Sequence, residues 1–137
     1  MLDHALESAF VACLQSDPAF AGVYFFTGQD DEEHQLPAIT VSAKSEPLTG
    51  SAEIFRADVS VMIESEAHDS RPDDHASLVE KVRSSLAAKA TLIAAINGAG
   101  KIHLYGYAFT ASTPDVDGTR FRTEFTLKAG YGVAAEN

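Results

Sequence analysis

The sequence has a single cysteine and no long run of apolar residues. Cys13 stands alone within an apolar helical pattern, which excludes a disulfide inside the chain. No positive charge nearby would lower its pKa, so we expect a small core residue and not a reactive thiol.

Because no run approaches ~18 apolar residues, we expect no transmembrane helix. The start MLDHALESAF lacks the basic and apolar regions of a signal peptide, which predicts synthesis and folding in a cytoplasm.

Basic residues are also scarce, because 10 Lys and Arg oppose 20 Asp and Glu, for a formal net charge of −10. Binding to a nucleic-acid backbone requires basic patches that displace counterions, so specific DNA binding is disfavoured. An acidic surface would instead repel DNA that passes close to it. The length of 137 residues fits one domain, and we expect residues 1–137 to form it.

Hydrophobic periodicity predicts three helices and a first group of strands. The expected helices cover residues 2 to 16, a stretch that begins near Pro72 and buries Leu78, Val79, Val82 and Leu86, and Thr91 to Asn97. A short strand is expected at Val23 to Phe26, and longer strands at Leu36 to Val41 and Ile54 to Ile63. The last of these alternates between two faces, with Phe55, Ala57, Val59, Val61 and Ile63 on one and Ile54, Arg56, Asp58, Ser60 and Met62 on the other. The two longer strands are predicted to form a hairpin.

A second hairpin is predicted in the last third of the chain. Its first strand starts at Lys101, with Ile102, Leu104 and Ala108 on one face and His103, Tyr105, Tyr107 and Phe109 on the other. Pro114 to Gly118 is expected to turn the chain into a long last strand, on which Phe121, Thr123, Phe125, Leu127, Ala129 and Tyr131 share one face. Hairpins separated by helices indicate an α+β domain, with an antiparallel-rich sheet of about four to five strands and helices packed on one face.

Two charged stretches contain few apolar residues to bury. The first holds four successive carboxylates, Asp30, Asp31, Glu32 and Glu33, and the second, residues 64 to 74, includes His68, Asp69 and Arg71. Like charges packed this closely repel one another. We expect the loops 28 to 36 and 64 to 74 to be solvated and mobile in the free subunit, and to become ordered on docking.

Candidate chemistry is sparse in this sequence. His68, Asp69, Asp73, Asp74 and His75 have the composition of a metal site, but structural zinc sites prefer Cys and His at defined spacings, so an acid-rich loop before a helix is favoured. Asp115 to Gly118 lacks the later acidic ligand of a calcium loop. Nearly every Asp and Glu is expected in a loop or on a polar face, and no Ser has the context of a nucleophile. We therefore predict no metal, no cofactor and no enzymatic activity.

The second face of the last strand carries Arg120, Arg122, Glu124 and Lys128. One side of an antiparallel sheet is often simply solvated. The alternative is that this face meets a neighbouring copy or another protein, where opposite charges would set the register. We predict the second role, and expect reversal of Arg120 and Arg122 to Glu to weaken assembly without changing the fold.

The layout of the chain resembles the tail-terminator, or tail-completion, proteins of long-tailed bacteriophages. The resemblance is carried by the leading helix, the strand Leu36-Pro37-Ala38-Ile39-Thr40-Val41, the strand Ala57-Asp58-Val59-Ser60-Val61-Met62-Ile63, the helix Leu78 to Leu86 and a closing strand after Asp117-Gly118. Neck, head-completion and tail-tube subunits have similar sizes and layouts, so a connector or tube role stays open. A small-ligand binding module is a further alternative.

The resemblance implies a structural virion protein without enzymatic activity. Such a protein forms a hexameric ring on the head-proximal end of the tail tube, ends tube polymerisation and provides the surface for head-tail joining. Its implied partners are its own copies, the tail-tube protein and the head-tail connector or neck proteins. DNA would pass through the ring without specific binding, and no membrane or cofactor would be involved. A closed ring requires a heterologous interface, in which one patch of each subunit meets a different patch of the next.

Overall fold

The computed structural model of the chain describes residues 2–28, 35–47, 54–66, 72–99, 102–117 and 120–133. Its elements follow in the order α1 (Leu2–Gln15), a 3-10 turn η1 (Pro18–Phe20), β1 (Tyr24–Thr27), β2 (Ala38–Pro47), β3 (Ile54–Glu66), α2 (Pro72–Ala87), α3 (Lys89–Gly98), β4 (Ile102–Asp117) and β5 (Arg120–Val133). No helix in these ranges is both long and apolar enough to span a membrane.

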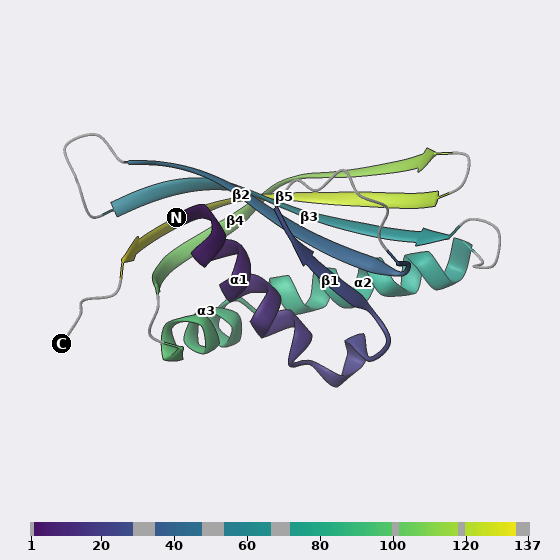
Figure 1. The fold of residues 1–137 in the computed structure, drawn as a ribbon, viewed down its shortest axis with the longest axis horizontal. Coiled ribbons are helices and arrows are strands. Elements are labelled where there is room, and N and C mark those ends of the chain that lie inside the picture. Colours follow the sequence, from purple (N-terminus) through teal and green to yellow (C-terminus); the bar gives the residue numbers. More distant parts are fainter. Residues whose placement is uncertain are drawn as a thin grey trace.

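The strands form one mixed sheet of five strands in the order β1-β2-β3-β5-β4. The short β1 runs parallel to β2, and the other three neighbouring pairs are antiparallel. Figure 1 shows the three helices on the same side of this sheet. The chain is therefore a small α+β domain, which confirms the predicted fold class.

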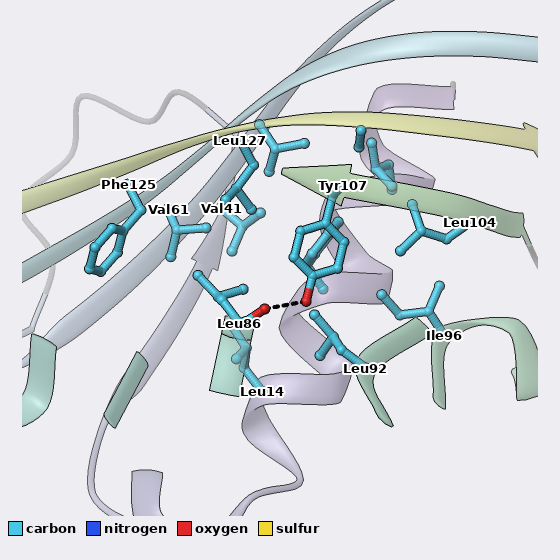
Figure 2. Packing of buried hydrophobic residues seen from close by; sticks show 14 of the residues in the cluster. Leu14, Val41, Val61, Leu86, Leu92, Ile96, Leu104, Tyr107, Phe125 and Leu127 are labelled. Carbon is cyan, nitrogen blue, oxygen red and sulfur yellow. Dashed lines mark hydrogen bonds between the residues drawn. The ribbon is translucent and has the colours of Figure 1, made fainter. Parts of the chain in front are cut away.

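The core lies between the sheet and the helices. Leu6, Phe10 and Leu14 recur every four residues along α1, so they share one face of the helix, and none is more than 1% exposed. The other helices contribute Val82, Leu86, Leu92 and Ile96. Figure 2 shows four of the helix side chains, Leu14, Leu86, Leu92 and Ile96, on the same side of the sheet as buried residues of β2, β3, β4 and β5. Complete burial of one such side chain contributes roughly 1.5–3 kcal/mol, so this layer supplies much of the stability.

The predicted alternation of β3 and β5 is confirmed. On β5 every second residue from Thr123 to Tyr131 is buried, including Phe125 and Leu127, and the residues between them are not. Phe125 pairs with Val61 of β3, and Leu127 with Val59, so both strands point their apolar sides at the helices. Period-two alternation is reliable here because both strands lie inside the sheet with one face on the core.

The predicted faces of β4 are wrong beyond Leu104. A register shift lies between Leu104 and Gly106, and a second between Phe109 and Ala111. An extra residue in one strand moves the following side chains to the opposite face. Tyr107, expected opposite Leu104, is therefore buried beside it, whereas Ala108 is exposed.

Three strands are also longer than predicted. β2 continues to Pro47, and β3 continues through Glu66 into the stretch expected to be a loop. β4 does not turn at Pro114, because Pro114 still pairs with Thr123 and Asp117 with Arg120. Proline is tolerated there because β4 is an edge strand of the sheet.

Candidate functional site

The side of the sheet opposite the helices is a candidate binding surface, which we call the open face. No described helix packs on it, as Figure 1 shows. Strand alternation places on it the following charged residues of β2, β3 and β5: Lys44, Glu46, Arg56, Asp58, Glu64, Glu66, Arg120, Arg122, Glu124 and Lys128. These are five basic and five acidic side chains, and the five basic ones are half of the 10 in the whole chain. Most of the net charge of −10 therefore lies elsewhere.

One end of the open face carries exposed ion pairs between neighbouring strands. The Arg56 guanidinium lies 2.8 Å from Glu46 across the β2–β3 pair, and Lys128 Nζ lies 3.6 Å from Asp58 across the β3–β5 pair. All four side chains are more than half exposed. Exposed pairs of this kind contribute about 0–1 kcal/mol to stability, so their charges remain accessible to a partner.

The other end of the open face is more buried. The Glu64 side chain is 9% exposed, and its Oε2 accepts a hydrogen bond from Arg120 at 3.0 Å, while Arg122 Nε lies 3.7 Å away. The Ser60 hydroxyl donates to Glu124 in the middle of the face. The Glu64 carboxylate is thus paired within one chain, whereas Arg122 Nε is buried without a hydrogen bond.

All four residues predicted to form an interface therefore lie on one face, as alternation required. Arg120, Arg122 and Lys128 pair with β3, and Glu124 accepts a hydrogen bond from it. These partners could not be seen in the sequence, because they depend on the register of β3 against β5. The residues predicted to lie in mobile loops lie outside the described ranges: Asp30, Asp31, Glu32, Glu33, His68, Asp69 and Arg71.

Two acidic side chains are buried, which the sequence did not predict. Glu64 is one, and Glu7 of α1, at 6% exposure, is the other. The Oε2 atom of Glu7 accepts a hydrogen bond from the Ala43 N–H at 2.8 Å. Asp3, four residues earlier on α1, accepts a hydrogen bond from the Ser45 N–H of the same strand. This four-residue spacing is the one signal in the sequence that relates Asp3 to Glu7.

His75 was predicted to lie in an acid-rich stretch and is instead buried, with 8% exposure. Its Nδ1 lies 2.9 Å from Ser65 Oγ and its Nε2 lies 3.0 Å from Thr123 Oγ1. Burial lowers the pKa of the His75 imidazole below 6.5. In a catalytic triad a carboxylate orients the histidine, but here His75 contacts two hydroxyls, those of Ser65 and Thr123, and Ser65 is itself buried. We therefore assign the cluster a structural role, in which it holds α2 to β3 and β5.

The remaining candidates for metal or thiol chemistry are only partly described. His68 and Asp69 are outside the described ranges, and Asp73 and Asp74 are exposed in the first turn of α2. Within the described residues, no group of three or more His, Cys, Asp or Glu side chains is placed to hold a metal ion. Burial raises the pKa of the Cys13 thiol, which packs against the core and stays protonated at neutral pH.

A search of protein-family models finds no match to the sequence, and a search of curated protein sequences finds none either.

Proposed function

We propose that the chain is a structural protein of the tail-terminator type, which assembles into a ring on the head-proximal end of a phage tail tube. In this role it ends tube polymerisation, presents a surface to the connector or neck proteins, and catalyses no reaction. The proposal combines the resemblance in layout with one structural observation. That observation is the open face, where five basic and five acidic side chains are arranged on long strands with no described helix over them.

The charge distribution supports contact through this face. Two copies that each carry a net charge of −10 repel one another over most of their surfaces. On β2, β3 and β5 this face carries equal numbers of the two signs, so a copy or a tube subunit meets less repulsion there than on a purely acidic surface. Charges of both signs on a fixed lattice of strands would also select one register over others. An acidic exterior elsewhere would keep DNA from adhering while it passes through the ring.

The direct test is negative-stain imaging of the purified protein, alone and mixed with tail tubes of the same phage. We expect rings, or tubes capped at one end and no longer growing. Continued growth with incorporation of the protein would identify a tube subunit, and binding to connectors but not to tubes would identify a neck protein. A particle that stays monomeric and binds none of these would overturn the proposal.

The role of the open face is tested best at its exposed end. Lys128→Glu breaks the pair with Asp58, and the swap Asp58→Lys with Lys128→Glu restores a pair of reversed polarity. Both changes lie at exposed positions, so we expect stability to change by about 0.5 kcal/mol or less. If a partner reads this charge pattern, both variants lower tube capping about tenfold or more. Capping by both variants at the parent level would show that the pair is merely solvated.

The Arg120 and Arg122 reversal is a poor assembly test, contrary to the expectation from sequence. Both arginines face the Glu64 carboxylate, which is 9% exposed. Two further carboxylates beside it would leave a nearly buried charge without a partner, which typically costs about 3–5 kcal/mol. We expect this variant to lose thermal stability before any effect on assembly can be measured.

A further inference from the structure

The outer edge of β2 is guarded by α1. β1 pairs only with Ala38 to Val41, and beyond Val41 no described strand lies on the outer side of β2. The backbone groups that point outward from an edge strand come from every second residue, here 43, 45 and 47. Unpaired groups of this kind form a template for another strand, and natural proteins usually block them.

Each outward N–H position of this edge segment is blocked. The Ala43 N–H donates to Glu7 Oε2 and the Ser45 N–H donates to Asp3 Oδ1, both at 2.8 Å. Pro47 has no N–H to offer. We call Asp3 and Glu7 the guard residues, because their carboxylates occupy the outward N–H groups of this edge. They lie four residues apart on α1, so one face of one helix blocks the whole segment.

We propose that this edge is a self-association site held closed by Asp3 and Glu7, and that its partner is the same edge of a second copy. The argument rests on the sequence of the segment. If two copies pair antiparallel about Ser45, Ser45 faces Ser45 of the second copy and Ala43 faces Pro47. Hydrogen-bonded positions exchange N–H···O bonds, so the two Ser45 residues bond mutually and each Ala43 donates to a Pro47 carbonyl.

The same register brings opposite charges together on the open face. Lys44 then lies opposite Glu46 of the second copy, and Glu46 lies opposite its Lys44. These are non-hydrogen-bonded positions, where side chains of antiparallel strands approach most closely. Both side chains are exposed in the free subunit, where the Glu46 carboxylate also forms the exposed pair with Arg56. The edge is therefore complementary to itself in hydrogen bonding and in charge, which favours a second copy over an unrelated peptide.

This inference goes beyond the proposed function and does not depend on it. Pairing about a two-fold axis gives a closed dimer, whereas a ring requires a heterologous interface. The guards would keep the edge from diverting subunits into dimers. The side chains of α1 thus decide which contact a free subunit makes.

The test is sedimentation velocity on the full chain with the guards removed. We expect Asp3→Ala with Glu7→Ala to dimerise with a dissociation constant about tenfold or more below that of the parent. The control Asp73→Ala with Glu80→Ala removes the same charge from exposed positions on α2, and should stay like the parent. In the chain with Asp3→Ala and Glu7→Ala, adding Lys44→Glu should weaken the dimer, because two acidic side chains then face each other. Adding both Lys44→Glu and Glu46→Lys should restore the dimer, because the opposite charges are then paired again.

Glu7 is buried, so circular dichroism must show that the double variant is folded. If it is not, Asp3→Ala alone frees the Ser45 N–H, and faster hydrogen exchange at that amide together with new dimer reports the opened edge. A folded guard variant that associates no more than the parent, equal dimerisation of the control, or failure of the charge swap to restore the dimer overturns the inference. None of these outcomes changes whether the protein caps tubes, so the proposed function is judged separately.

Discussion

At the scale of single residues, several polar side chains are buried, and each joins two elements. His75 of α2 bridges the hydroxyls of Ser65 and Thr123, and its ring also lies 5.7 Å, centroid to centroid, from Phe121. A buried imidazole between two hydroxyls is satisfied when neutral, because one ring nitrogen donates and the other accepts. A proton added there would be desolvated, and the hydroxyl that donates to the ring would have to rotate and accept a hydrogen bond instead.

The first prediction is therefore a loss of stability in mild acid. Burial holds the pKa of His75 below its ordinary 6.5, so the folded state binds this proton less readily than the unfolded state. The stabilisation is fully present above pH 6.5 and is lost as the pH falls below that value. Urea unfolding of the parent and of His75→Asn at pH 8, 7, 6 and 5 measures the difference. The stability of the parent should fall more steeply below pH 6.5, and parallel curves would contradict the assignment.

At the scale of elements, β4 is positioned by the helices as much as by β5. The Asn97 side chain at the end of α3 accepts from the Leu104 N–H at 2.7 Å and donates to the Leu104 carbonyl at 3.2 Å. The next residues contain the register shift that brings Tyr107 inward, where its hydroxyl donates to the Leu86 carbonyl near the end of α2 (Figure 2). These contacts join α2 and α3 to one edge strand.

The second prediction concerns this link. Tyr107→Phe removes the hydroxyl and leaves a buried carbonyl without this donor, which should lower the free energy of unfolding by about 1–2 kcal/mol at neutral pH. Burial, with a smaller effect of Cys13, raises the pKa of Tyr107 to about 12. The stability that depends on the protonated phenol is thus intact below pH 10 and declines as the pH rises toward 12. Thermal unfolding from pH 8 to 11 should show this decline in the parent and not in Tyr107→Phe; an equal decline in both would contradict it.

At the scale of the whole molecule, one sheet holds the domain together. β3 and β5 each have a strand on both sides, whereas β1 is a short edge strand and β4 has a free outer side within the described residues. The two sides of the sheet are protected differently. On one side, α1 side chains block the part of β2 that extends beyond β1, and on the other side, β4 contains register shifts and Pro114. Both edges are blunted in ways that limit uncontrolled strand addition.

The third prediction follows from this arrangement. Backbone amides of β3 and β5 should exchange hydrogen most slowly, because their release requires opening of the central sheet and core. Amides of β1 should exchange faster by about tenfold or more, since that strand is four residues long and lies at an edge. Residue-resolved exchange of the monomer measures both. Equal protection of β1 and β5 would show that the sheet opens as a single unit.

Much of this architecture follows from local patterns. The sequence alone determined the three helices, the apolar and charged faces of β3 and β5, and the α+β class, because spacing of apolar residues dictates which side of a helix or strand can be buried. It also determined that Arg120, Arg122, Glu124 and Lys128 share one face. Strand ends were less certain, since a charged residue such as Glu64 looks like the start of a loop until its partner is known.

Only the tertiary structure decided which residues far apart in the chain meet. The pairing of Glu64 with Arg120, the enclosure of His75 and the closing of the β2 edge by Asp3 and Glu7 each join segments separated by 10 to 56 residues. The shift that turns Tyr107 inward likewise depends on how β4 pairs with β5. The physical reason is the same in each case: periodicity records the side on which a residue can be buried, but the desolvation of a polar group is offset only by a particular partner, and that partner is brought there by strand register and helix docking.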